Sequence, residues 1–302
     1  MTTTFYSNGK LLITAEYGVL DGALALALPT KYGQSLEVRP FQDAIIQWNS
    51  IDEKGHIWFS GRYKVDTFDL IDGSDEPLAK TLEQLLKKVK ALNPNLNAAH
   101  QGLELTSKLT FPRNWGLGSS STLINNLAQW GTVDAYTLLE QTFGGSGYDI
   151  ACAQYNAPIH YRLEKGLPSV KKVSLQLPFT EKLYFVFLNK KQDSREAIAN
   201  YRKQDFEQSE LVNELTNLTA KLTKTKSLKE FESLITLHEK VLSRVLKIAP
   251  VKERLFSDYF GAIKSLGGWG GDFILATGNE KTPDYFKAKG FNVVIPYREM
   301  IL

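Results

Sequence analysis

A glycine- and serine-rich segment near the middle of the chain has the composition of an anion-binding loop. It reads Pro-Arg-Asn-Trp-Gly-Leu-Gly-Ser-Ser-Ser over residues 112–121, between an expected strand and an expected helix. Gly116 and Gly118 remove side chains, so backbone N–H groups can approach an anion closely. The following helix directs its free N–H groups and the positive end of its dipole at the same point. The segment therefore predicts a phosphate site, with a glycine turn and a serine N-cap as the alternative.

Three serines at the start of this helix extend the same chemistry. Ser119, Ser120 and Ser121 add hydroxyl donors, and one of them could also ligate Mg²⁺. No Gly-Lys-Ser/Thr follows the glycines, so the segment does not match the P-loop pattern.

An aspartate follows a second glycine-rich turn. The turn covers residues 144–147, and Asp149 lies just after it, at the expected start of a helix. The helix dipole favours the ionised carboxylate there. Such a carboxylate could accept a proton from a substrate hydroxyl, and the alternative is a helix-start carboxylate with no chemical role.

Two further segments could contact a ligand: one is rich in glycine, and the other contains a lysine. Residues 267–271 contain four glycines, and we expect them to join a helix over 252–266 to a strand that begins at Phe273. The glycines indicate close backbone approach to a ligand or to another loop, unless they form only a tight connection. Lys10 lies at the beginning of an apolar strand, where a surface lysine is the alternative to a buried and paired one.

The elements that must position these segments are strands and helices of an α+β chain. Residues up to about Phe111 read mainly as strands, interrupted by one helix that begins near Pro77 and has helically spaced leucines. The later predicted elements are helices over 119–130 and 133–142, a helix from Tyr148, strands over 158–177, a buried strand over 183–188 and long amphipathic helices over 194–247. We place the boundary between two lobes at residues 165 and 166.

Composition argues against several classes of function. The 36 Lys and Arg residues against 33 Asp and Glu give a formal charge of +3, which is too balanced for a typical nucleic-acid-binding protein. The most apolar early run, residues 22–29, is too short to span a bilayer, and the first residues lack the pattern of a signal peptide. The single cysteine, Cys152, fits a reducing compartment. We expect a cytoplasmic protein with no nucleic-acid or membrane partner, and no histidine metal site because the four histidines are scattered.

Taken together and in this order, the segments resemble the GHMP superfamily of small-molecule kinases. The first motif of that family resembles residues 7–17, its phosphate loop resembles 112–121, its catalytic aspartate turn is similar to 146–149, and its closing glycine loop resembles 267–272. Residues 16–20 and 145–151 are most similar to mevalonate and phosphomevalonate kinases. The resemblance covers almost the whole chain.

The resemblance implies a fold and an activity. The fold has an N-terminal ribosomal-protein-like α/β lobe, residues 1–165, and a ferredoxin-like C-terminal lobe, residues 166–302. The activity is transfer of the γ-phosphate of ATP, with Mg²⁺, to a hydroxyl or phosphate of a small metabolite, with mevalonate or phosphomevalonate favoured. We expect a monomer or homodimer. The alternatives are a sugar kinase of the same superfamily and a non-catalytic nucleotide-binding relative.

The resemblance also implies roles for individual residues. Asp149 is expected to be the base for the accepting hydroxyl, and Lys10 is expected beside it to keep it ionised and to stabilise the developing alkoxide. The residues expected to bind the ATP phosphates are Gly116, Leu117, Gly118, Ser119, Ser120 and Ser121, together with Gly268, Gly270 and Gly271 of the closing loop. The residues expected near the substrate are Glu16, Tyr17, Ser146, Gly147 and Ser194. The expected Mg²⁺ ligands are Ser120 and Glu140.

The sequence departs from the family pattern at several positions. The first motif usually reads Ala-Pro-Gly-Lys, whereas residues 7–10 read Ser-Asn-Gly-Lys. The gap between Ser120 and Asp149 is short, and in mevalonate kinases the missing helix carries the Mg²⁺-binding glutamate. Glu140 is the nearest candidate, with an exposed helix carboxylate as the alternative. Trp115 and Trp269 stand where small residues are common, and we expect at least one of them to line the active site, with packing beneath the loops as the alternative.

Overall fold

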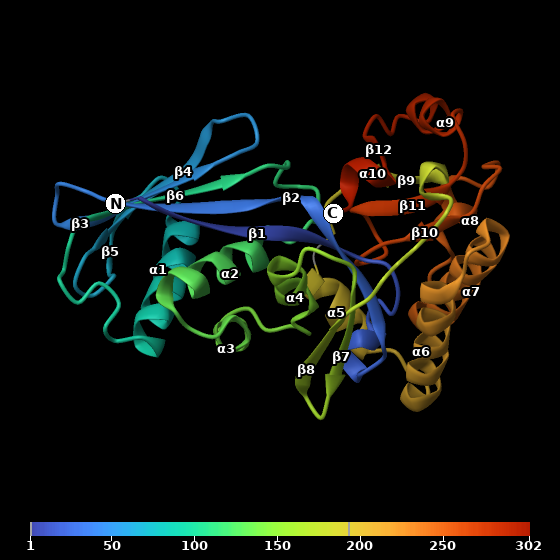
Figure 1. The fold of residues 1–302 in the computed structure, drawn as a ribbon, viewed down its shortest axis with the longest axis horizontal. Helices are drawn as coiled ribbons and strands as arrows, with labels where there is room; N and C mark the ends of the chain where they lie inside the picture. The colour runs from blue at the N-terminus through green and yellow to red at the C-terminus, as the bar shows by residue number, and fades with distance from the viewer. Residues whose placement is uncertain (1, 193) are drawn as a thin grey trace. The chain divides into compact units, whose positions relative to one another are not determined.

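The computed structural model of the protein describes residues 2–192 and 194–302, and its elements are labelled in Figure 1. The chain divides into two compact units. Unit 1 comprises the segment up to Gly9, Tyr32–Arg113 and Leu117–Gln154. Unit 2 comprises Lys10–Lys31, Asn114–Gly116 and Tyr155–Leu302.

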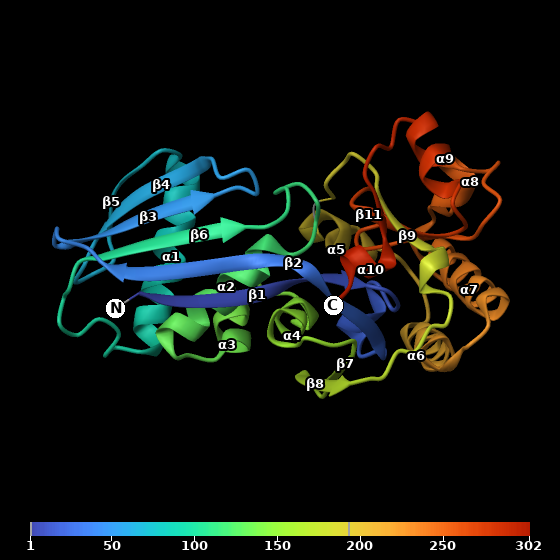
Figure 2. The same ribbon diagram turned by 45° about the horizontal axis from the view of Figure 1, so that its top comes forward.

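Unit 1 is a sheet covered by helices on one face (Figures 1 and 2). The strand order is β5-β4-β3-β6-β2, and β1 also pairs with β2. The strands are β1 (Thr3–Leu12), β2 (Ala25–Pro40), β3 (Ile45–Ile51), β4 (Ile57–Lys64), β5 (Leu70–Gly73) and β6 (Leu103–Leu109), of which β1 and β2 also extend into unit 2. β3 shows why the sheet has one covered face, because Ile46, Trp48 and Ser50 are buried at every second position.

The helices of unit 1 are α1 (Glu76–Leu92), α2 (Ser119–Gly131), α3 (Ala135–Glu140) and α4 (Tyr148–Gln154). α1 begins where Asp75 accepts a hydrogen bond from the Leu78 N–H, and its buried residues recur at helical spacing. The helices contribute Leu86, Ile124, Leu138 and Ile150 to one apolar core with the sheet. The predicted helices in this part of the chain are therefore present, with slightly different ends.

Unit 2 contains a second, antiparallel sheet in the order β10-β11-β9-β12. Its strands are β9 (Leu183–Phe187), β10 (Ile263–Ser265), β11 (Phe273–Thr277) and β12 (Val294–Pro296). The long helices are α5 (Ser194–Arg202), α6 (Gln208–Lys224) and α7 (Leu228–Leu246), and the shorter ones are η1 (Gly18–Asp21), η2 (Thr180–Lys182), α8 (Val251–Leu255), α9 (Thr282–Ala288) and α10 (Tyr297–Met300). Residues 25–27 of β2 pair with β7 (Ile159–Glu164), which pairs with β8 (Leu167–Lys172). Within the described ranges, no helix is both long and apolar enough to cross a membrane.

The predicted helix over 252–266 is wrong. α8 ends at Leu255, and residues 263–265 form β10, which pairs antiparallel with β11. All three residues of β10 are buried. The strand pairs with β11, and the Ser265 N–H and C=O groups bond to the side chains of Glu239 and Lys264. The glycine loop 267–271 therefore connects two strands of one hairpin.

Candidate functional site

The predicted phosphate loop leads into α2 through two glycines with left-handed backbone. Gly116 has φ 68° and Gly118 has φ 87°, a region that residues with a Cβ rarely adopt. Gly118 is the N-cap of α2, and no side chain among the described residues caps the helix. The serine N-cap alternative is therefore absent, and the N–H groups of residues 119–121 have no intrahelical acceptor. Ser120 is exposed, Ser119 is half-buried and Ser121 is buried.

Gly116 is also required by a close contact within unit 2. A Cβ at this position would lie 2.3 Å from Oδ1 of Asp272, so the carboxylate rests directly on the loop backbone. Asp272 Oδ1 accepts a hydrogen bond from the Gln192 N–H at 3.2 Å. Burial raises the pKa of Asp272, and the Lys10 ammonium acts in the opposite direction. Lys10 and Gly116, two predicted site residues, thus share Asp272 as a neighbour.

The closing loop meets another chain segment rather than open space. Added Cβ atoms at Gly268 and Gly270 would lie 2.5 Å and 2.2 Å from side-chain atoms of Gln192, and one at Gly271 would lie 2.3 Å from the Lys190 carbonyl oxygen. These three glycines are therefore needed for the approach of residues 190–192. Their predicted contact with the transferred phosphate stays a prediction.

Both loop tryptophans pack within unit 2. The Trp115 ring meets Phe273 edge-on at 5.5 Å between centroids and lies 6.5 Å from Phe187. Trp269 is buried with φ 58°, and its indole N–H has no hydrogen-bond partner among the described residues. Packing beneath the loops is thus observed for both rings, and the prediction that one lines the active site stays a prediction.

The predicted base lies on a helix that packs against the phosphate-loop helix. Asp149 is in the first turn of α4 and is half-buried, and α4 packs against α2 within unit 1. Ser146 and Gly147 precede it and are buried, and Gly147 has φ 83°. Glu140 is the last residue of α3 and is exposed.

The predicted substrate residues in unit 2 have neighbours of their own. Tyr17 has φ 62° and stacks on Tyr201 of α5 at 5.1 Å between ring centroids. The Tyr201 hydroxyl donates a hydrogen bond to Asp21. Ser194 begins α5, but its side chain lies outside the described part of the chain.

Glu16 belongs to a buried ionic cluster that the sequence did not reveal. Its Oε1 pairs with Nζ of Lys264, and the two side chains are 1% and 0% exposed. Lys264 also donates to the Ser265 carbonyl at 2.8 Å and lies 4.0 Å from Oε1 of Glu239. His238 accepts a hydrogen bond from the Ala15 N–H at 2.8 Å. The cluster joins the segment after β1 to α7 and to β10, the strand that enters the closing loop.

The protonation of this cluster follows from its burial. Burial raises the pKa of Glu239 to about 7, with Lys264 opposing the shift and Glu16 adding to it. Burial also lowers the pKa of His238 well below its usual range, with Lys264 adding to the effect. His238 is therefore neutral, and its Nε2 forms no ion pair with Oε2 of Glu16, which lies 3.4 Å away. Glu239 and His238 lie in the otherwise apolar buried stripe of α7, and polar residues in such a stripe are the signal that could have identified them.

Glu239 is expected to make the protein less stable as the pH rises. Its carboxyl holds a proton more tightly in the folded state, so this stabilisation is complete below about pH 4.5 and is lost as the pH rises to about 7. The loss is on the order of 3 kcal/mol. Glu239→Gln should remove this part of the difference between the free energies of unfolding at pH 5 and pH 8. The exposed residue Glu253 offers the control Glu253→Gln, and a wild-type pH dependence in Glu239→Gln would refute the assignment.

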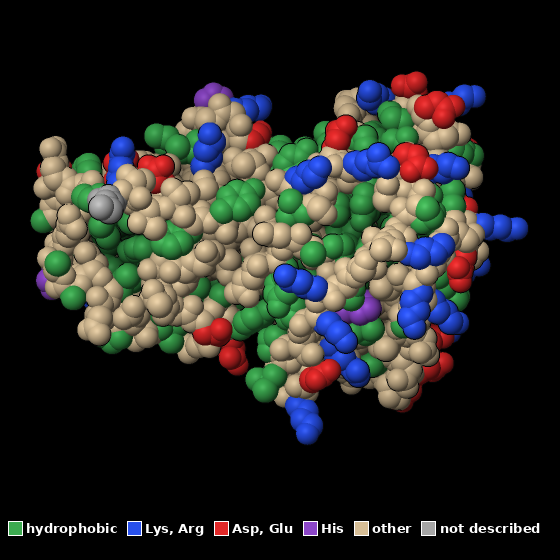
Figure 3. All heavy atoms as spheres, viewed as in Figure 1, with side chains coloured by type: hydrophobic (Ala, Val, Ile, Leu, Met, Phe, Trp, Pro, Cys, Tyr) green, Lys and Arg blue, Asp and Glu red, His purple; other side chains and the backbone are tan. Residues whose placement is uncertain are grey.

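Unit 2 carries a positive surface region. Figure 3 shows Lys and Arg side chains gathered on the part of the face that carries β7, β8 and α6. The exposed basic residues there are Arg162, Lys165, Lys171, Lys172, Lys221, Lys224 and Lys226. Such a local field attracts anionic ligands even though the net charge of the chain is small.

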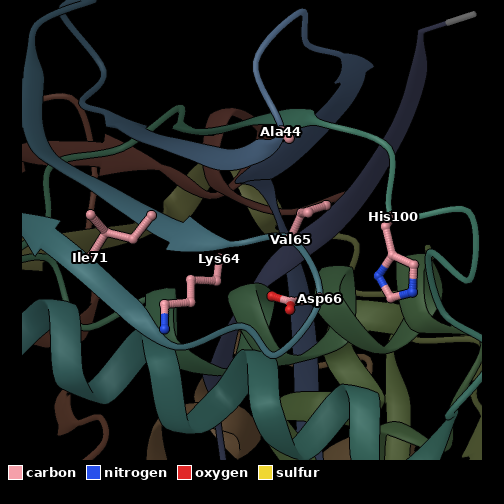
Figure 4. A pocket seen from close by; sticks show the side chains of 6 residues that line it. All are labelled: Ala44, Lys64, Val65, Asp66, Ile71 and His100. Carbon is pink, nitrogen blue, oxygen red and sulfur yellow. The ribbon is translucent and has the colours of Figure 1, made fainter.

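A separate open pocket lies at the other end of β6 from the phosphate loop. It has a volume of about 530 Å³ and is lined by Ala44, Lys64, Val65, Asp66, Ile71 and His100 (Figure 4). His100 precedes β6, whereas the phosphate loop follows it. The pocket contains none of the predicted site residues.

Three solved structures are similar to the chain over most of their length. Mevalonate kinase from Methanococcus jannaschii is 17% identical, with a TM-score of 0.71 over 96% of this chain and 94% of that chain. Phosphomevalonate kinase from Streptococcus pneumoniae, in complex with phosphomevalonate and AMPPNP, is 14% identical, with a TM-score of 0.69 over 95% of each chain. Galactokinase from Lactococcus lactis, complexed with galactose, is 14% identical, with a TM-score of 0.66 over 96% of this chain and 89% of that chain. No protein-family model and no curated protein sequence matches the chain.

The chain has the GHMP-kinase fold. At the predicted phosphate loop, an uncapped helix N-terminus follows two left-handed glycines, an arrangement that can bind an anion. In the described ranges, no group of three or more His, Cys, Asp or Glu residues is placed to hold a metal ion. The predicted Mg²⁺ ligands Ser120 and Glu140 lie in the first turn of α2 and at the end of α3, and their role stays a prediction.

Proposed function

We propose that the protein is an ATP-dependent kinase that phosphorylates a small metabolite. The observation that carries the proposal is the phosphate loop itself: within a GHMP-kinase fold, α2 begins with free N–H groups behind two left-handed glycines. The S. pneumoniae phosphomevalonate kinase with this fold was solved with AMPPNP, an ATP analogue. That neighbour supports ATP as the phosphate donor.

The residues divide the chemical work between them in this proposal. ATP would supply the phosphoryl group, and Mg²⁺ held with it by Ser120 and Glu140 would neutralise part of its charge. The N-terminus of α2 and the serines 119–121 bind phosphate oxygens. Where the acceptor is a hydroxyl, Asp149 takes its proton, and Lys10 stabilises the developing alkoxide. Alignment and charge neutralisation supply most of the rate enhancement.

The acceptor that we propose is mevalonate or phosphomevalonate, in a cytoplasmic enzyme that is a monomer or homodimer. Two of the three similar structures are kinases of these metabolites, and the motif stretches 16–20 and 145–151 point the same way. Glu16 is occupied by Lys264, so we assign it a structural role and keep Tyr17, Ser146, Gly147 and Ser194 as candidates for acceptor contacts. The division of the chain into an N-terminal lobe, residues 1–165, and a C-terminal lobe, residues 166–302, is also part of this proposal.

A coupled ADP-release assay tests this function. The acceptors are mevalonate, phosphomevalonate, homoserine and galactose, each with ATP and Mg²⁺. We expect turnover with mevalonate or phosphomevalonate, and loss of turnover in Lys10→Met. Turnover only with galactose would instead support the sugar-kinase alternative. ATP binding without turnover on any acceptor would support the non-catalytic alternative.

A further inference from the structure

A relay of buried hydrogen bonds runs through unit 1 beneath the phosphate loop. Ser7 of β1 donates from its hydroxyl to Oδ1 of Asn126 at 2.7 Å, and it accepts from Nδ2 of Asn125 at 2.8 Å. Asn126 Nδ2 donates to the backbone carbonyl of Gln34 at 2.9 Å. Gln154 of α4 donates to Oδ1 of Asn125 at 3.0 Å. One hydroxyl and three side-chain amides thus connect β1, β2, α2 and α4.

A second branch starts at the side chain of Gln34. Its Nε2 donates to the hydroxyl of Ser107 on β6 at 2.6 Å, and its Oε1 accepts from the Thr122 hydroxyl at 2.5 Å. Thr122 is in the first turns of α2, directly after the three serines. The first turns of α2, which follow the predicted phosphate loop, are therefore hydrogen-bonded to β2. The same side chain of β2 is hydrogen-bonded to β6.

The relay is buried and internally satisfied. Every member except Gln154 is buried, and each of the three buried amides has both a donor and an acceptor contact. A buried polar group without a partner is costly, whereas a fully satisfied network holds its members in one arrangement. Sliding or rotating α2 along the sheet would break several of these bonds together.

The relay also accounts for one departure from the family pattern. Ser7 stands where the first motif of GHMP kinases usually has alanine, and an alanine there would offer no hydroxyl to Asn125 and Asn126. The serine in β1 and the two asparagines in α2 therefore depend on one another for their hydrogen bonds. Lys10 follows Ser7 by three positions in the same strand.

We propose that the relay formed by Ser7, Asn125, Asn126, Gln34 and Gln154 is a positioning device for phosphoryl transfer. It fixes α2 on the sheet and α4 on α2, and so sets where the phosphate-binding N–H groups and the helix of Asp149 lie within unit 1. A displacement of about 1 Å of such groups can cost on the order of 100-fold in rate. The inference deepens the proposed kinase function and rests on it.

The first test removes the central hydroxyl. Ser7→Ala is expected to lower kcat about tenfold or more. Ile46→Val is the control, because it weakens the core of the same unit on β3 without touching the relay. Ser7→Thr keeps the hydroxyl and should restore most of the rate. The inference would be overturned if Ile46→Val lowered the thermal midpoint as much as Ser7→Ala does and also lowered kcat as much.

An apolar repacking separates positioning from stability. In Ser7→Ala/Asn125→Leu/Asn126→Leu no unpaired amide remains on α2, so the thermal midpoint should recover towards wild type. We expect kcat to stay low. If both recover together, the relay is only structural. Gln154→Leu covers the case in which the core variants fail to fold. It breaks only the α4 branch, at an exposed residue, and it should lower kcat with a smaller loss of the thermal midpoint than Ser7→Ala causes.

Hydrogen–deuterium exchange keeps this inference distinct from the proposed function. Wild-type turnover is measured first, and its absence on every acceptor would refute the kinase proposal alone. In either case, Ser7→Ala or Gln154→Leu should speed amide exchange in both α2 and α4, and Ile46→Val should not. Unchanged exchange in these two helices would refute the relay as a positioning device.

Discussion

Replacing Asp149 with asparagine is expected to lower kcat by about 10²–10⁴-fold while nucleotide affinity stays at the wild-type value. Asparagine keeps the size of the side chain but cannot take the proton of the accepting hydroxyl. The phosphate loop lies at the start of α2 and is unchanged, so ATP should bind as before. Steady-state ADP release gives kcat, and calorimetry with ATP gives the affinity.

A matched control for this substitution is Asp43→Asn. Asp43 is an exposed aspartate of unit 1 in the segment between β2 and β3, so its change should leave kcat as it is. Wild-type turnover in Asp149→Asn would mean that another group takes the proton. Loss of ATP binding in Asp149→Asn would mean that the residue supports the nucleotide site rather than the chemistry.

Lys264→Met is expected to lower the free energy of unfolding by about 3–5 kcal/mol, because it leaves a buried carboxylate without its cation. Glu16 is enclosed as fully as Lys264, and burial already raises the pKa of Glu16 while Lys264 opposes that shift. Without the lysine, Glu16 must bind a proton or draw water into the core of unit 2. Chemical denaturation followed by circular dichroism measures the loss.

The double variant Glu16→Gln/Lys264→Met tests the physical reason. It removes both charges, so it should regain much of the stability lost in the single variant. The comparison for simple loss of a lysine hydrogen bond is Lys252→Met. Lys252 is a partly buried lysine on α8 that donates to the Gly261 carbonyl at 2.6 Å. A loss in Lys264→Met no larger than in Lys252→Met would contradict the buried-pair argument.

Local patterns in the sequence predicted much of the fold. The leucine spacing and Pro77 predicted α1, and the glycine turn before Tyr148 predicted the start of α4. β10 was missed because it is only three residues long and is stabilised by pairing with β11, which lies beyond the glycine loop. Its strand character therefore depends on a neighbour and not on its own composition.

The site was predicted less completely because its contacts join distant parts of the chain. Glycine at position 116 was expected for an approaching phosphate, but the structure adds Asp272 as a second reason. Glu16 was expected at the substrate, and nothing near it in the sequence indicates a lysine at position 264 as its partner. The asparagine pair of α2 looked like an ordinary part of a helix until Ser7 was placed against it.

The path of β2 has a consequence for how the protein is made. Its residues 25–27 pair with β7 and its residues 34–40 pair with β6, so two stretches of one strand serve different units. On the ribosome, the segment 10–31 emerges early, yet its partner Tyr161 and the second sheet are synthesised much later. All residues of unit 1 have been synthesised once Gln154 has left the ribosome. Residues 10–31 of unit 2, in contrast, keep their apolar surface exposed until the rest of unit 2 has been synthesised. Nascent chains halted before β7 should therefore be the forms that chaperones hold longest.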